Sequence, residues 1–213
     1  DNYEYAFPVI KKHQIPVTLF AVSNMIGTQK HFWPNRISNL LQRATDQQLA
    51  HIEWLHPDIK TVASKGFSAE NAAGIIDQMK KWPDNEIVEW LTKTEQENNI
   101  LSPPTAPLMS WDQLREMQTS GLVEIGSHTQ NHVRLKQNIS TALLASEIVD
   151  SKRVLENKID APVNLFCYPN GDYCAEASRL VQQTYQAAVT TQRGINQLSR
   201  CLLYTSPSPR DDR

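Results

Sequence analysis

The 213-residue sequence is short of several features, and each shortage excludes a class of protein. No apolar run approaches the roughly 18–20 residues of a membrane-spanning helix, so we expect no transmembrane segment. Three cysteines are too few for the disulfide framework of a small secreted scaffold. Neither charge dominates, with 21 Lys and Arg against 23 Asp and Glu, so the composition gives no reason to expect nucleic acid or an anionic membrane as a partner.

The sequence also lacks an initiator Met and a signal peptide, since it opens on Asp1, and we interpret it as a piece of a longer protein. It does contain enough apolar residues for a core, because 40% of the residues are hydrophobic and there are five Trp, six Tyr and five Phe. This composition excludes wholesale disorder. The length predicts one ordinary domain or two small ones.

The end of the chain reads differently from the rest. Residues 201–211, CLLYTSPSPRD, match the in-frame translation of a common transposase-type sequencing adapter. We therefore interpret residues 201–213 as an adapter-derived artefact rather than as a natural Ser/Pro-rich tail. The other two cysteines, Cys167 and Cys174, are separated by six residues across a predicted turn, and we expect two thiols rather than a disulfide.

Helical and strand patterns alternate along most of the chain. Short runs of β-branched and aromatic residues predict buried strands, and apolar residues at helical spacing predict the helices between them. The predicted strands cover residues 16–22, 122–126, 163–168 and 187–191, and the predicted helices cover residues 6–13, 111–120, 140–158 and 175–184. This alternation implies parallel strands with helices outside, in either a barrel or an open α/β sheet.

The segment 35–106 interrupts this alternation. It has apolar residues at helical spacing, no strand pattern and a stiff proline-rich end, and we interpret it as a helical insertion or lid with its linker. Four tryptophans in or beside it could stack on sugar rings, although packing within a helical subdomain is the favoured interpretation. These are Trp33, Trp54, Trp82 and Trp90.

Two histidines come just after the predicted strand 122–126. His128 and His132 are four residues apart, so a helical turn after the strand would bring both imidazoles within reach of one metal ion. Catalytic groups in parallel α/β folds gather at the carboxyl ends of strands, which favours this interpretation. The spacing alone leaves open that both are surface histidines, or that one is buried in the core and one exposed.

Four stretches of the sequence, taken in order, carry a resemblance to a known family. They are residues 5–20, residues 111–117, Ile125–His132 with the sequence IGSHTQNH, and residues 166–171 with the sequence FCYPNG. Together they resemble the polysaccharide deacetylases (NodB homology domain, carbohydrate esterase family 4), the third being similar to that family's histidine motif. The resemblance covers roughly residues 2–34 and 107–200.

The resemblance implies a fold, an activity and a partner. The expected fold class is α/β, a distorted, TIM-like (β/α) barrel of the polysaccharide deacetylase type, incomplete and with a helical insertion. The expected activity is metal-dependent hydrolysis of acetyl groups, chiefly N-acetyl groups on amino sugars, from an acetylated polysaccharide or cell-wall glycan. The resemblance also favours an extracytoplasmic or cell-envelope location. The expected divisions are residues 1–34 (start of the barrel, without its first strand), 35–106 (insertion and linker), 107–200 (rest of the barrel) and 201–213 (artefact).

The resemblance also implies roles for single residues. His128 and His132 would be two ligands of a divalent metal, commonly zinc, which polarises the acetyl carbonyl and lowers the pKa of bound water. The backbone N–H of Asn170 would stabilise the developing oxyanion. The substrate-binding turn around it would consist of Tyr168, Pro169 and Gly171. By itself, this turn is typical of an ordinary strand-to-helix loop.

The sequence departs from the family pattern in three places. The family's paired aspartates, which serve as base and third metal ligand, would lie before residue 1, and Asp1 takes neither role. Cys167 stands where the family often has Arg, and the late Leu-x-His motif would fall beyond Arg200. We therefore expect a fragment that is inactive on its own. The alternatives are a non-catalytic carbohydrate-binding or exopolysaccharide-assembly protein on the same scaffold and, less favoured, an unrelated metal hydrolase.

Overall fold

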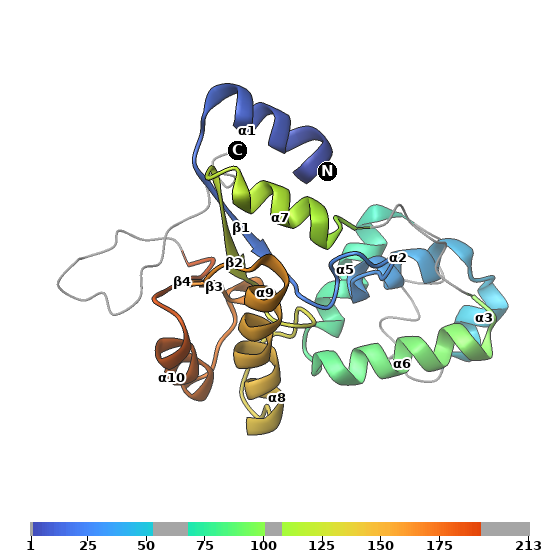
Figure 1. Ribbon diagram of the computed structural model, residues 1–213. Coiled ribbons are helices and arrows are strands. Elements are labelled where there is room, and N and C mark those ends of the chain that lie inside the picture. Colours follow the sequence, from blue (N-terminus) through green and yellow to red (C-terminus); the bar gives the residue numbers. More distant parts are fainter. Residues whose placement is uncertain (1, 53–67, 101–107, 193–213) are drawn as a thin grey trace. The chain divides into compact units, whose positions relative to one another are not determined.

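The computed structural model describes residues 2–52, 68–100 and 108–192 of the chain (Figure 1). The chain divides into two compact units, one of Asp1–Gln29 together with Pro107–Arg213 and the other of Lys30–Ala106. Three predicted features lie outside the described residues: the adapter-like tail 201–213, most of the proline-rich linker and Trp54.

A parallel four-stranded sheet lies at the centre of the first unit, in the strand order β1-β2-β3-β4 (Figure 1). The strands are β1 (Val17–Ala21), β2 (Val123–Ser127), β3 (Leu165–Cys167) and β4 (Ala187–Val189). Their parallel direction and their approximate positions in the sequence are those predicted. β1 and β2 pair along their whole length, whereas β2 meets β3 at a single register pair, Ser127 with Phe166. A parallel sheet places the carboxyl ends of all its strands at one edge, where ligand sites gather in such folds.

Helical segments connect these strands. They are η1 (Asn2–Ala6), α1 (Phe7–His13), α7 (Trp111–Thr119), α8 (Thr141–Ala145), η2 (Ser146–Asp150), α9 (Ser151–Ile159), η3 (Pro169–Gly171) and α10 (Ala175–Thr184). The predicted continuous helix over residues 140–158 is instead two α-helical pieces joined by η2, a turn of π-helix. Such turns insert a residue into a helix and are frequent at functional sites.

The core of the first unit lies between the sheet and these helices. Phe166 of β3 is fully buried, with its ring centroid 5.0 Å from that of Tyr185. The apolar stripe predicted for the segment 140–158 faces this core, because each of its members is buried. Those members are Leu144, Ile148, Leu155 and Ile159. Burial of a Leu or Ile side chain contributes about 1.5–3 kcal/mol, so this stripe is a principal support of the sheet.

A capping box formed by Ser110 and Gln113 begins α7. The Ser110 hydroxyl accepts a hydrogen bond from Gln113 N at 3.2 Å, and the Gln113 side chain accepts one from Ser110 N at 2.8 Å. We expect Ser110→Ala to lower the free energy of unfolding by about 1 kcal/mol, because Gln113 N–H loses its acceptor in the first turn. Urea denaturation measures this loss, and an unchanged unfolding midpoint would contradict it.

The second unit is helical over its described residues. Its helices are α2 (Trp33–Arg43), α3 (Asp46–His51), α5 (Ala69–Met79) and α6 (Asp84–Glu97). Trp33 is buried and donates its indole N–H to Asp84 at 3.0 Å, and Arg36 donates two hydrogen bonds to the carboxylate of Glu95. Trp82 packs against the core of the unit, which favours packing over sugar stacking for both tryptophans.

Every helix among the described residues is too short or too polar to cross a lipid bilayer.

Candidate functional site

The predicted histidine pair lies at the carboxyl edge of the parallel sheet. His128 comes directly after β2, and Cys167 is the last residue of neighbouring β3. The backbone N–H of His128 donates to the carbonyl of Ala21, the last residue of β1, at 2.9 Å. This bond extends the pairing of β1 and β2 by one residue. It fixes the backbone of His128 at the carboxyl ends of both strands.

The imidazole of His128 has a fixed orientation. Its Nδ1 lies 2.7 Å from the backbone carbonyl oxygen of Cys167. A carbonyl oxygen can only accept a hydrogen bond, so Nδ1 carries the hydrogen and Nε2 keeps its lone pair. Metal-binding histidines commonly donate their second ring N–H to a carbonyl or carboxylate in this way.

His132 lies beside His128, with the two ring centroids 4.8 Å apart at an angle of 75°. The helical turn expected between the two histidines is wrong. The intervening segment is an irregular loop in which Thr129 has φ of 68° and His132 itself has φ of 63°. Residues other than glycine rarely adopt this left-handed conformation. Contacts with the rest of the protein, rather than local preference, must therefore hold the loop.

Burial favours the neutral form of both imidazoles. Together with smaller contributions from the charges of His128 and Arg134, it lowers the pKa of His132 to about 4. Burial also lowers the pKa of His128, against the opposing effect of its hydrogen bond to the Cys167 carbonyl. A neutral imidazole has the lone pair that a metal ligand needs.

The histidine loop is hydrogen-bonded to the segment that follows β1. Ser23 N donates to the Thr129 carbonyl at 3.2 Å, Asn24 N donates to the Gln130 carbonyl at 3.0 Å, and the Asn24 side chain donates to Asn131 at 3.0 Å. Two buried hydroxyls at this junction, Ser23 Oγ and Thr129 Oγ1, have no hydrogen-bond partner among the described residues. Unsatisfied buried hydroxyls are rare in proteins, and each calls for a specific explanation.

Two buried charged residues near the loop were not predicted. Arg134 is 5% exposed, and Glu147 is fully buried. Glu147 directly precedes Ile148 of the apolar stripe, and a charged residue at the buried face of an amphipathic helix was the signal that could have found it. Nothing in the sequence marked Arg134 as buried.

The turn after β3 has the form that the sequence predicted. Gly171 N donates to the Tyr168 carbonyl at 2.8 Å, and Asn170 has φ of 55° at the turn position that favours Gly or Asn. The Thr191 hydroxyl donates to the Asn170 carbonyl at 3.1 Å. The Asn170 N–H belongs to this exposed turn. Its role as an oxyanion donor stays a prediction.

The side chains of Tyr168 and Pro169 lie beneath this turn. Both residues are buried, and the Tyr168 ring contacts those of Phe166 and Tyr173, with centroids 5.1 Å and 5.0 Å away. Burial raises the pKa of Tyr168 to about 12. These side chains support the turn from below, so a substrate would meet the turn chiefly at exposed Asn170. Substrate binding by Tyr168 and Pro169 stays a prediction.

Cys167 and Cys174 are free thiols, as predicted. Burial raises the pKa of Cys167 to about 11, so its thiol is protonated at neutral pH and is not an activated nucleophile. The contact with His128 comes from the backbone carbonyl of Cys167 rather than from its side chain. The Cys in place of the family's Arg therefore leaves the orientation of His128 intact.

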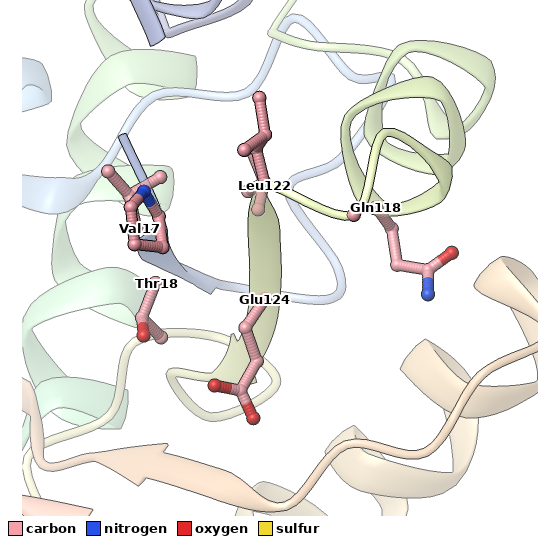
Figure 2. Close-up of a pocket in the computed structure, with 8 residues that line it drawn as sticks. Val17, Thr18, Gln118, Leu122 and Glu124 are labelled. Carbon is pink, nitrogen blue, oxygen red and sulfur yellow. The ribbon is translucent and has the colours of Figure 1, made fainter. Parts of the chain in front are cut away.

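A surface hollow of about 480 Å³ lies at the amino ends of β1 and β2, the opposite edge of the sheet (Figure 2). Figure 2 shows Thr18 and Glu124 on these two strands, where they are register partners. The lining residues are Pro16, Val17, Thr18, Gln118, Gly121, Leu122, Val123 and Glu124. This lining includes one carboxyl group and no His or Cys, so we place the candidate site at the carboxyl edge, with the histidines.

The residues at the carboxyl edge fit part of a metal site. His128 and His132 are adjacent and neutral, and His128 has the outer-shell carbonyl partner typical of a metal ligand. Within residues 2–52, 68–100 and 108–192, no group of three or more His, Cys, Asp or Glu lies close enough together to hold a metal. The described residues thus offer two nitrogen ligands, and catalytic zinc sites commonly have three protein ligands.

The fold and the site together define an α/β protein with two candidate metal-ligating histidines at the carboxyl edge of a parallel sheet. The family model for polysaccharide deacetylases matches residues 1–189. The chain therefore belongs to the polysaccharide deacetylase family. This match runs through residues 35–106, which the resemblance described above did not cover.

Individual relatives agree with this assignment. YxkH of Bacillus subtilis (strain 168), whose name places it among the polysaccharide deacetylases, is 33% identical over 84 residues, which are 39% of this chain and 29% of that protein. Two similar solved structures are IcaB from Ammonifex degensii, with a TM-score of 0.56 at 16% identity, and a de-N-acetylase from Aggregatibacter actinomycetemcomitans, with 0.51 at 17%. The match to IcaB covers 98% of this chain and 63% of IcaB, and the match to the de-N-acetylase covers 96% of this chain and 64% of that protein. The fold is therefore the distorted (β/α) barrel of the polysaccharide deacetylases, as predicted, and the chain spans less than two thirds of these relatives.

Proposed function

We propose that the whole protein removes acetyl groups, chiefly N-acetyl groups of amino sugars, from a polysaccharide or cell-wall glycan by metal-dependent hydrolysis. One observation carries the proposal: His128 and His132 lie side by side at the carboxyl edge of the sheet, and the Cys167 carbonyl orients His128. Family membership supports the substrate class. The fold shared with a protein described as a de-N-acetylase supports the choice of the N-acetyl group.

His128 and His132 would hold the metal ion, and zinc suits a pair of neutral imidazoles. When bound, such an ion supplies a Lewis acid for the acetyl carbonyl and for water. The hydrogen bond to Cys167 keeps the His128 lone pair on Nε2, so this imidazole needs no rearrangement before it coordinates. The base that deprotonates the attacking water is not assigned to a described residue.

The Asn170 N–H would stabilise negative charge on the acetyl oxygen as water adds to the carbonyl carbon. The left-handed conformation of Asn170 and the Thr191 hydroxyl bond to its carbonyl fix the direction of this peptide group. A preorganised donor of this kind contributes about 10²–10³ to kcat. The exposed position of the turn suits a polymeric substrate, and such a glycan would place the protein outside the cytoplasm or at the cell envelope.

Acetate release tests the proposal. We expect the whole protein to release acetate from chitin oligomers or peptidoglycan faster than from acetylated xylan, whose acetyl groups are O-linked. A chelator should stop the reaction and added zinc should restore it, because the metal activates both carbonyl and water. Acetate release that is indifferent to the chelator would contradict the metal dependence. Glycan binding without any acetate release would favour the non-catalytic alternative.

A further inference from the structure

We propose that Glu147 is a positioning residue that holds the loop from His128 to His132 in the geometry that lets both imidazoles bind one metal. The inference rests on the proposed function, since it concerns the same metal site. Glu147 belongs to η2, a different element from the histidines, and its hydrogen bonds go to the loop between them.

The loop needs such a support because its backbone is strained. Thr129 and His132 both have left-handed φ values, which L-residues adopt only when their surroundings impose them. Thr129 is β-branched, which makes this conformation still less favourable. On one side, Ser23 and Asn24 pair with the loop through hydrogen bonds. The backbone N–H groups of Ser23 and Asn24 donate to carbonyl groups of the loop. The N–H groups of the loop itself need acceptors from another element.

The carboxylate of Glu147 provides those acceptors. Its Oε2 accepts hydrogen bonds from the consecutive backbone N–H groups of Gln130 and Asn131, at 3.0 Å and 2.9 Å. Its Oε1 accepts from the Asn131 side-chain amide at 2.7 Å. Consecutive N–H groups that converge on one oxygen form an anion-binding nest, and hydrogen bonds to a charged acceptor are stronger than neutral ones. A fully buried carboxylate with three donors is satisfied only while the loop keeps this shape.

The element that carries Glu147 is itself well anchored. Ser146 donates its hydroxyl to the Gln130 side chain at 2.8 Å, which adds a fourth bond between η2 and the loop. On its other side, Ile148 is fully buried and its carbonyl accepts a hydrogen bond from the Tyr185 hydroxyl at 2.7 Å. The loop is therefore fixed to the core of the unit, as a preorganised metal site requires.

The test compares Glu147→Gln with the matched control Glu156→Gln in the whole protein, with zinc alone as the probe. Glu156, on α9, also accepts a backbone N–H, from Val163 at 3.0 Å, but at the opposite end of the helix from the loop. A glutamine side chain has one acceptor oxygen and one donor NH2 group. In Glu147→Gln, the NH2 group would therefore lie against an N–H group of the loop that now donates to the carboxylate. We expect calorimetry to show about tenfold weaker zinc binding for Glu147→Gln and unchanged binding for Glu156→Gln.

Amide hydrogen exchange separates positioning from a general loss of stability. In Glu147→Gln, the amides of Gln130 and Asn131 should exchange about tenfold faster, while amides of β1 and β2 remain protected. A milder variant, Asn131→Ala, leaves the carboxylate with two of its three hydrogen bonds and also removes the bond from the Asn24 side chain to Asn131. We expect it to stay folded and to bind zinc about threefold more weakly. If Glu147→Gln does not fold, the zinc affinity of Asn131→Ala tests the positioning role of Glu147 instead.

The outcomes distinguish the inference from the proposed function. Equal zinc affinity in the wild-type protein and in the folded variants at Glu147 and Asn131 overturns the inference and leaves the proposed function standing. So does a lower thermal midpoint with unchanged zinc affinity, because that result assigns Glu147 a structural role only. Absence of zinc binding by the wild-type protein contradicts the proposed function, and the inference with it.

Discussion

Replacement of His132 by alanine is expected to abolish metal-dependent acetate release by the whole protein. Zinc binding should weaken by more than the roughly 10- to 100-fold that the loss of an outer-shell partner costs, because a ligand itself is removed. The described residues offer two nitrogen ligands at the site, so each carries a large share of the affinity. His128→Ala should have the same effect, and it also removes the hydrogen bond to the Cys167 carbonyl. Calorimetric zinc titration and an acetate assay measure the two effects separately.

The matched control is His13→Ala. His13 is exposed in the last turn of α1, so its replacement changes the histidine count without touching the carboxyl edge of the sheet. We expect unchanged zinc affinity and activity in this variant, with at most a small loss of helix stability from the missing interaction with the helix dipole. Survival of activity in both His128→Ala and His132→Ala, with metal still bound, would show that the ligand assignment is wrong.

Gly171→Ala is expected to destabilise the protein by about 2 kcal/mol or more and to impair catalysis. Gly171 has φ of 73°, where any side chain adds strain. An added Cβ would also overlap the Thr191 hydroxyl and lie 2.8 Å from the Thr191 backbone nitrogen. Thr191 would have to move, and with it the hydrogen bond that fixes the Asn170 carbonyl. We expect kcat of the whole protein to fall by about tenfold to 100-fold, because the proposed oxyanion donor, the Asn170 N–H, would be displaced.

Gly74→Ala is the control for this substitution and should act in the opposite direction. Gly74 lies in the interior of α5, is exposed, and has no neighbouring atom within 4 Å of an added Cβ. Alanine should therefore stabilise the helix by about 0.5–1 kcal/mol. Denaturant titrations of the two variants would give opposite shifts of the unfolding midpoint. A neutral Gly171→Ala would show that the turn relaxes around the new methyl group and that its geometry is not essential.

The elements that were predicted correctly are those whose signals are local. The strands are short runs of β-branched and aromatic residues, and α7 begins at a capping box that four consecutive residues encode. The carboxyl edge of the sheet as the place of the histidines also followed from strand order, since parallel strands end together. In these cases the sequence pattern and the three-dimensional environment require the same residue types.

The details that were not predicted depend on contacts between distant residues. The histidines meet through a loop with left-handed residues rather than through a helical turn. Hydrogen bonds donated by Asn24 and accepted by Glu147 hold this loop against the preference of Thr129 for a negative φ. The π-helical turn η2 interrupts a helix whose apolar periodicity reads as continuous. Glu147 within this turn is buried and accepts hydrogen bonds from the histidine loop, a distant partner that residue spacing does not reveal. The packing of the Tyr168 ring in the core is a further detail that the sequence did not indicate, and substrate binding by this residue stays a prediction.

The side chain of His128 also links β2 to β3 through a hydrogen bond. β2 and β3 share one register pair, Ser127 with Phe166, and the Nδ1–H bond to Cys167 adds a second tie just beyond it. The other ring tautomer would break this tie, because it would turn a lone pair toward the carbonyl oxygen. The hydrogen bond to Cys167 therefore favours the tautomer with the hydrogen on Nδ1. Fraying of β3 from β2 would leave His128 on β2 but would remove the carbonyl that orients its ring, so the pairing of these two strands also sets the direction of a proposed metal ligand.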